Sequence, residues 1–115
     1  MQAFNVTQQR TLASMLMVAD SFFQSLIGLM GRPGLEVGHG LWIVPCQSVH
    51  TFWMRFPIDV IFLDEQRNVI HLVESLRPFR ISRHLSNARS VIELPASSIQ
   101  ATGTQLGDEI RIAEA

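Results

Sequence analysis

Residues 50–64 read His-Thr-Phe-Trp-Met-Arg-Phe-Pro-Ile-Asp-Val-Ile-Phe-Leu-Asp, and they carry the clearest signal in the chain. Two apolar runs, rich in β-branched and aromatic residues, flank residues 55–57, which is typical of strands joined by a tight link. His50 and Asp59 interrupt these runs. An ionisable group in a buried strand must be neutralised, paired or used, because an unpaired buried charge is costly. We therefore expect the candidate site in this stretch.

Further β-type runs lie on both sides of residues 50–64, and short connections between them favour antiparallel pairing. The acidic and amide residues at 64–68 predict a hairpin turn. If residues 55–57 also close a hairpin, His50 faces Phe62 and Trp53 faces Asp59. The expected strands cover residues 11–18, 41–44, 49–54, 58–64, 69–76, 89–94 and 109–113.

Two helices are expected beside these strands. Asp20 is a strong N-cap, apolar residues recur at helical spacing over residues 21–30, and Pro33 prevents continuation, so a helix of about 21–30 is expected to pack on the sheet. A short second helix of about 96–102 ends at Gly103. The pattern therefore predicts a mainly β (α+β) fold.

Length and composition indicate one globular domain. The chain has 115 residues with 47% hydrophobic and 17% charged residues, which suits a single core at residues 11–115 preceded by a loose leader at 1–10. Residues 1–19 imitate a signal peptide, but no Ala-x-Ala pattern follows. Since Cys46 is the one cysteine, no intrachain disulfide forms, and a reducing cytoplasmic location is expected.

Charge narrows the classes of partner. The net charge of -1 gives no reason to expect nucleic acid or an anionic membrane as a partner. All nine basic residues are Arg, so Schiff-base chemistry through Lys is excluded. No cofactor motif is evident. The oligomeric state cannot be read from these features.

Six segments, in this order, resemble the DUF192 family, a set of small prokaryotic proteins of uncharacterised function. The resemblance covers roughly residues 12–112, and it implies a compact, barrel-like antiparallel β fold with one packed helix, in a protein of bacterial type. Many members carry a secretory leader, and residues 1–19 of this chain do not resemble one. It implies no established reaction. The segments are GLMGR at 28–32, GLW at 40–42, HTFWM at 50–54, IDVIFLD at 58–64, VIELP at 91–95 and LGD at 106–108. The family's recurring positions fall here on Gly28, Met30, Gly31, Arg32, His50, Phe52, Met54, Asp59, Phe62, Asp64, Glu93, Gly107 and Asp108.

Three ionisable residues in apolar strands are the candidates for chemistry. His50, Asp59 and Glu93 could serve a hydrolase-like enzyme, with or without a divalent metal, but no HxH or CxxC pattern supports a metal site. Each residue also has a purely structural alternative. His50 could be a core imidazole, Asp59 could hold a turn or an Arg, and Glu93 could pair with Arg89 or Arg111. Cys46 could act with His50 as nucleophile and base only if the strand bends.

Residues 77–89 form a long connection with four Arg and no acid. Arg binds carboxylate or phosphate in a bidentate way, so this loop could recognise an anionic group, or it could be a solvated loop. The leading hypothesis is a non-catalytic module that binds a small molecule or a protein partner in a cleft around residues 50–64. The enzyme and an interaction or assembly accessory remain alternatives. The expected ligand-binding residues are His50, Trp53, Asp59, Arg55, Arg77 and Arg80.

Overall fold

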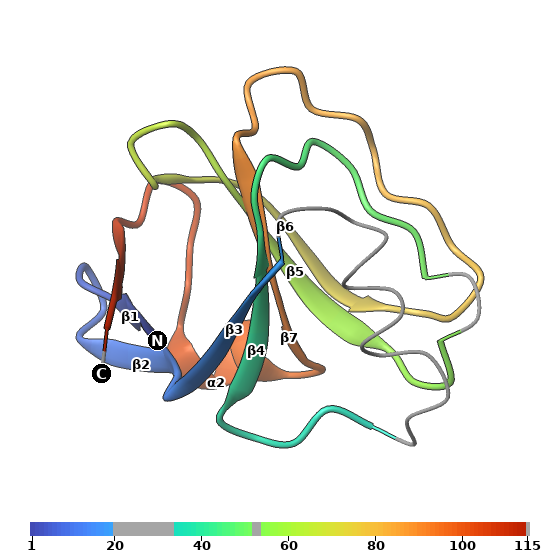
Figure 1. Cartoon of the computed structure of the whole chain (residues 1–115), viewed down its shortest axis with the longest axis horizontal. Helices are drawn as coiled ribbons and strands as arrows, with labels where there is room; N and C mark the ends of the chain where they lie inside the picture. The colour runs from blue at the N-terminus through green and yellow to red at the C-terminus, as the bar shows by residue number, and fades with distance from the viewer. Residues whose placement is uncertain (20–33, 52–53, 115) are drawn as a thin grey trace.

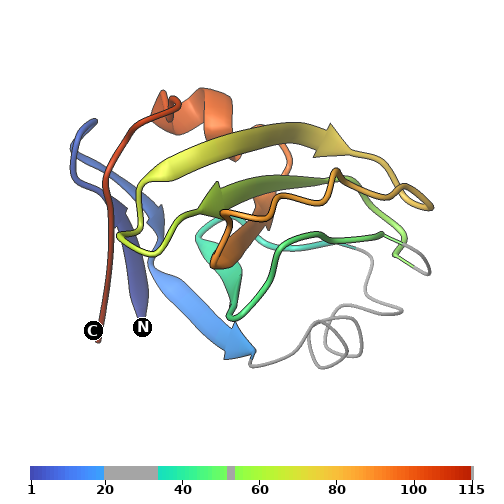
Figure 2. The ribbon, with the colours of Figure 1, turned by 90° about the horizontal axis from the view of Figure 1, so that it is seen from above.

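The computed structural model describes residues 1–19, 34–51 and 54–114. These residues form eight strands and one short helix (Figures 1 and 2). The mainly β class predicted from the sequence is therefore confirmed, whereas the helix expected at 21–30 lies outside the described residues. The elements are β1 Gln2–Asn5, β2 Arg10–Ala13, β3 Met15–Ala19, β4 His39–Ile43, β5 Ile58–Leu63, β6 Val69–Leu76, β7 Ser90–Pro95, α2 Ser98–Thr102 and β8 Ile110–Ala113.

The strands form two sheets instead of the expected barrel. The larger sheet has the order β3-β4-β7-β5-β6, and the smaller has the order β2-β1-β8. Across the described residues neither sheet closes on itself. The larger sheet is also not wholly antiparallel, because β3 runs parallel to β4. A parallel pair needs a connection of a dozen or more residues, and 19 residues of sequence separate the end of β3 from the start of β4.

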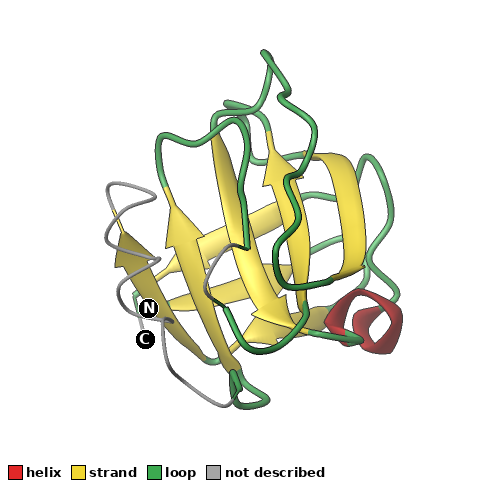
Figure 3. Cartoon of the chain, turned by 90° about the vertical axis from the view of Figure 1, so that its right-hand side faces the viewer, coloured by secondary structure: helices red, strands yellow, loops and turns green. Residues whose placement is uncertain are grey.

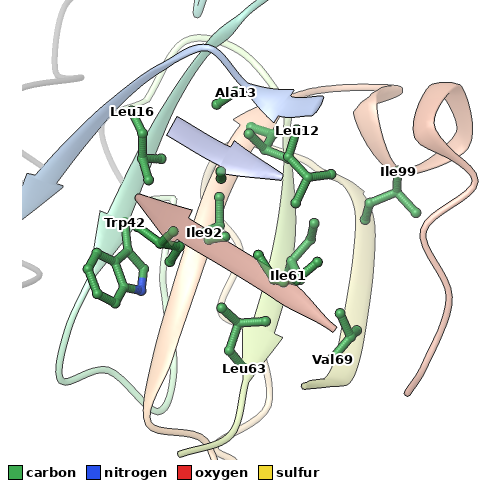
Figure 4. Close-up of a cluster of buried hydrophobic side chains, with 13 residues drawn as sticks. Leu12, Ala13, Leu16, Trp42, Ile61, Leu63, Val69, Ile92 and Ile99 are labelled. Carbon is green, nitrogen blue, oxygen red and sulfur yellow. The ribbon is translucent and has the colours of Figure 1, made fainter. Parts of the chain in front are cut away.

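The core occupies both faces of the larger sheet. All six residues of β5 are buried, which explains why residues 58–63 read as a nearly continuous apolar run. One face packs against the smaller sheet through such side chains as Leu12, Ile61 and Ile92, shown in Figure 4. The other face carries a second cluster that includes Val60 and Phe62. At Gly40 a side chain would come within 2.8 Å of Leu94 Cδ2, so glycine permits this close packing.

The predicted hairpin across residues 55–57 is wrong. Strand β5 is already paired on both edges, with β6 and with β7, so residues 49–51 cannot join it. Asp59 lies opposite Leu94, and Phe62 lies between Val91 and His71. In the described part of residues 49–54, regular pairing is limited to one bridge between His50 and Ile81. The hairpin turn at 64–68 is confirmed by the antiparallel pairing of β5 and β6.

The expected loose leader is instead part of the fold. Strand β1 lies between β2 and β8 in the smaller sheet, and Ala3 and Asn5 are fully buried. The run expected at 11–18 is divided at Ser14 into β2, in the smaller sheet, and β3, in the larger one. The many polar side chains among residues 1–10 did not predict a strand. The pairing that makes β1 a strand is with β8, at the far end of the chain, and cannot be read from the local sequence.

Helix α2 confirms the short helix expected near 96–102, and Figure 3 shows it beside one end of the strands. Gly103 follows with a φ of 67°, the left-handed conformation typical of a residue that ends a helix. The side chain of Ser97, the N-cap residue, makes no hydrogen bond to the helix. The N-terminus of α2 is stabilised from the larger sheet.

Candidate functional site

Asp59 is the residue that stabilises α2. Its side chain is fully buried. One carboxylate oxygen accepts a hydrogen bond of 2.8 Å from the backbone N–H of Ser75, and the other accepts one of 2.8 Å from Ile99 in the first turn of α2. Ser75 has a φ of 52°, so the carboxylate also holds an irregular point of β6. Both oxygens are engaged by backbone, which is the structural role that the sequence left open: Asp59 holds a turn.

Glu93 lies on the opposite face of the sheet from Asp59. Asp59 is paired with Leu94, and Glu93 is paired with Val60, and neighbouring residues of a strand point to opposite faces. Glu93 is 1% exposed, and its Oε2 has no hydrogen-bond partner among the residues that the structure describes. Burial raises the pKa of Glu93 to about 8. The ion pair with Arg89 or Arg111 is not formed, so neither guanidinium offsets the effect of burial, which favours the protonated form of Glu93.

Cys46 is not activated. Its thiol donates a hydrogen bond of 3.1 Å to the carbonyl of Ser48, two residues away. Burial raises the pKa of Cys46 to about 11, and the nearby Glu93 carboxyl acts in the same direction. A thiol with a raised pKa is a poor nucleophile at neutral pH, because the thiolate is the reactive form. The Cys46–His50 nucleophile therefore has no support.

The segment that carries His50 pairs with the basic loop, not with β5. Thr51 is fully buried, and its hydroxyl accepts a hydrogen bond of 2.9 Å from the Arg80 N–H and donates to the Arg77 carbonyl. Its backbone N–H also donates to the Arg80 carbonyl at 2.9 Å. Thr51 therefore holds residues 77–80, and this part of the loop has a defined backbone.

The side chains of this loop point outward. Arg55, Arg77 and Arg80 are all exposed, and none of them forms an ion pair with the residues that the structure describes. Phe79 is 56% exposed and Ile81 is 68% exposed. Large apolar side chains among arginines are typical of surfaces that contact another molecule. Trp53, the other expected ligand contact, lies outside the described residues.

A groove lies at the far end of β5 from Asp59. We call it the rim groove; it consists of a pocket of about 760 Å³ and an adjoining pocket of about 250 Å³ that share Gln47, Ala88 and Arg89. Five residues of strand separate Asp59 from Asp64 at its edge, a distance of about 16 Å. The first pocket is lined by Gln47, Asp64, Glu65, Gln66, Ile70, Ser86, Asn87, Ala88 and Arg89, and the second by Pro45, Cys46, Gln47, Ala88 and Arg89.

The walls of the rim groove are held by hydrogen bonds. The Arg89 N–H donates to the Leu63 carbonyl at 2.8 Å, and the Arg89 carbonyl accepts from Cys46 at 2.9 Å. The Gln47 amide, also in the lining, donates to the Ser86 carbonyl at 2.8 Å. On the other wall an Asp64 oxygen accepts backbone bonds of 2.9 Å from Gln66 and Asn68. The groove is therefore preformed.

The expected residues do not come together as one site. Within residues 1–19, 34–51 and 54–114, no three His, Cys, Asp or Glu side chains lie where they could hold a metal ion. The sequence predicted Asp64 as a turn residue and a recurring family position, and Arg89 as one end of the basic loop and a possible partner of Glu93. It did not predict that the two line one groove. The one feature that Asp64 and Arg89 share in the sequence is that each stands at the end of a segment, β5 for Asp64 and the basic loop for Arg89. No helix in these residues is long and apolar enough to cross a membrane.

Comparisons with known proteins agree with the fold. The chain is 34% identical over 111 residues to a UPF0127 protein of Thermococcus sibiricus, covering 92% of this chain and 71% of that one. It is 32% identical to a UPF0127 protein of Pyrococcus furiosus, covering 92% and 93%. A crystal structure of a protein of unknown function from Novosphingobium aromaticivorans matches with a TM-score of 0.77 at 20% identity, covering 96% of this chain and 82% of that one.

The two named sequence relatives are archaeal, so the bacterial type expected from the sequence stays a prediction. A family model described as DUF192, an uncharacterized ACR, matches residues 4–112. This match spans both sheets, α2 and every residue of the rim groove. The chain therefore belongs to the uncharacterised DUF192 family.

Proposed function

We propose that this chain is a non-catalytic binding module that takes a small polar ligand in the rim groove. The observation that carries the proposal is the groove itself, in which residues 64–66 face residues 86–89 across about 760 Å³. That volume lies in the range of small-molecule sites. The proposed site adjoins the C-terminal end of residues 50–64, where the sequence analysis expected a cleft, and lies away from His50.

The lining favours a ligand with both donors and acceptors. Asp64 and Glu65 supply carboxylates, Gln66 and Asn87 supply amides, and Arg89 supplies a guanidinium. Amides both donate and accept, whereas a guanidinium only donates and a carboxylate only accepts. A polyol such as a sugar, or a small molecule with an amine and a carboxylate, matches this set. Ile70 and Ala88 add an apolar surface to the groove.

The chemistry of the buried ionisable groups supports binding without turnover. Asp59 uses both oxygens on backbone N–H groups, and Glu93 lies in an apolar cluster on the other face of the sheet. A general base must reach the proton that it removes. Because none of the groups proposed for a hydrolase lines the rim groove, a ligand there meets no acid–base pair from that set.

A thermal-shift panel tests the proposal with neutral sugars, amino acids, dicarboxylates and inorganic phosphate. At about 100 times its Kd, a ligand stabilises the protein by about 2.7 kcal/mol. The Asn87→Trp variant fills the groove from an exposed position, and we expect it to lose the shift. Gln100→Trp, exposed on α2, is the matched control and should keep it. The proposed binding site would be contradicted if no compound in the panel raised the melting temperature, or if Asn87→Trp kept the increase.

A second candidate is an interaction accessory that docks on an acidic protein surface. Exposed Phe79 and Ile81 between Arg77, Arg80 and Arg83 favour it, since Phe and Arg are enriched in protein interfaces. A photo-crosslinking residue at Ile81 is expected to give one adduct in the cell, lost in an Arg80→Gln, Arg83→Gln background. The same label at Leu106, 65% exposed elsewhere, should give none. Equal adducts at both positions would rule the docking surface out.

A further inference from the structure

The parallel pairing of β3 and β4 brings three metal-binding side chains together at the edge of the larger sheet. Met15 lies directly opposite His39, and Met17 follows two residues later on the same strand. Figure 1 shows β3 beside β4. Residues at i and i+2 of a strand, and paired residues of neighbouring strands, share a face. The two thioethers and the imidazole therefore lie on one side of the sheet.

The register gives short spacings. Cα atoms at i and i+2 of a strand are about 7 Å apart, and neighbouring strands are about 4.8 Å apart. Methionine has three rotatable bonds, so its sulfur can move by several ångströms without backbone change. Both sulfurs and one imidazole nitrogen can thus approach a common point, whereas rigid side chains at these positions could not.

Burial argues against a packing role for these methionines. Met15 is 60% exposed and Met17 is 57% exposed, although both belong to a strand whose Leu16 and Ala19 are buried. A pocket of about 350 Å³ opens at this place, with Met15, Met17 and His39 in its lining. Exposed thioethers beside a half-buried imidazole are available to a ligand from solvent.

The environment of His39 also suits coordination. Its Nε2 lies 3.7 Å from a carboxylate oxygen of Glu36, and its backbone N–H donates to the Glu36 carbonyl at 3.0 Å. At 3.7 Å the Glu36 carboxylate is beyond hydrogen-bond distance of Nε2, so its contribution is a negative charge beside the imidazole, where a cation would bind.

We propose that Met15, Met17 and His39 form a binding site for Cu(I), independent of the rim groove. Neutral thioethers are soft ligands and select Cu(I), while divalent zinc or magnesium requires thiolate, imidazole or carboxylate groups that this set does not provide in number. Coordination by two sulfurs and one nitrogen involves no redox step: the ion binds as Cu(I) and stays Cu(I).

Competition for Cu(I) with bicinchoninate, under anaerobic reducing conditions, tests the site in the full chain. A Cys46→Ser background is run in parallel, because a thiol also binds Cu(I). We expect one equivalent to bind in both backgrounds, and Met15→Leu and Met17→Leu each to weaken binding at least about tenfold. Met54→Leu, at a buried methionine, is the volume-conserving control and should change nothing.

Ag(I), which has the same ligand preference and no redox chemistry, gives a second readout by NMR. The methyl signals of Met15 and Met17 and the ring signals of His39 are expected to shift together at one equivalent. The proposal is overturned if no stoichiometric binding occurs, if the two leucine variants bind as tightly as the parent, or if binding disappears in the Cys46→Ser background alone.

Discussion

Asp59→Ala is expected to lower the free energy of unfolding by about 3–5 kcal/mol, since hydrogen bonds to a charged group contribute about 1.5–3 kcal/mol each. The substitution removes the acceptor for two backbone N–H groups, at Ser75 and Ile99, inside a fully buried site. It therefore releases the first turn of α2 and the irregular point of β6 together. Urea denaturation with a fixed m-value measures the loss.

The amide variant separates this structural role from a catalytic one. Asp59→Asn keeps one acceptor but places an NH₂ group against the other N–H, so we expect it to lose a large part of the same stability. Asp64→Ala, at an exposed turn, is the control and should cost much less, because water can replace its bonds. Full stability in Asp59→Asn would show that the carboxylate is not needed for the fold.

Glu93→Gln is expected to make stability less dependent on pH. Burial raises the pKa of Glu93 to about 8 in the folded state, above its ordinary value of 4.5. Below that ordinary value both states hold the proton. As the pH rises toward 8 the unfolded state has released a proton that the folded state keeps, so the wild type loses stability, by on the order of 4 kcal/mol between pH 5 and pH 9.

The glutamine variant has no proton to release, so it should match the wild type near pH 5 and exceed it near pH 9. Chemical denaturation at a series of pH values measures both curves. Glu109→Gln removes an exposed carboxylate and should follow the wild type throughout. Parallel curves for wild type and Glu93→Gln would mean that the carboxyl titrates alike in the folded and unfolded protein, which would contradict the effect of its burial.

Local signals predicted much of the fold. The turn at 64–68 was visible because an Asp at its start can accept bonds from its own backbone, and Asp64 does so with Gln66 and Asn68. The run at 69–76 coincides with β6, and the apolar run after Pro57 coincides with β5. Each of these features depends on residues close in the sequence.

Pairing between distant segments could not be predicted. Alternation is the same whether a strand joins its sequence neighbour or a strand fifty residues away, so the link at 55–57 looked like a hairpin until β7 and β6 were seen beside β5. The prediction of a candidate site around residues 50–64 depended on the same wrong pairing. Because β5 pairs with β7 and not with residues 49–54, Asp59 lies opposite Leu94 and Glu93 lies opposite Val60, which puts the two carboxyl groups on opposite faces of the sheet. The rim groove and the Met15–His39 pair likewise exist only through long-range pairing.

The most direct measurement is an NMR titration of isotopically labelled protein with the compound that gives the largest thermal shift, followed over several days. A binding module predicts saturable changes at the amides of Gln66, Asn87 and Arg89, and ligand signals that stay unchanged with time. Changes confined to His50 and Arg55, or new signals from a converted ligand, would contradict a non-catalytic site in the rim groove.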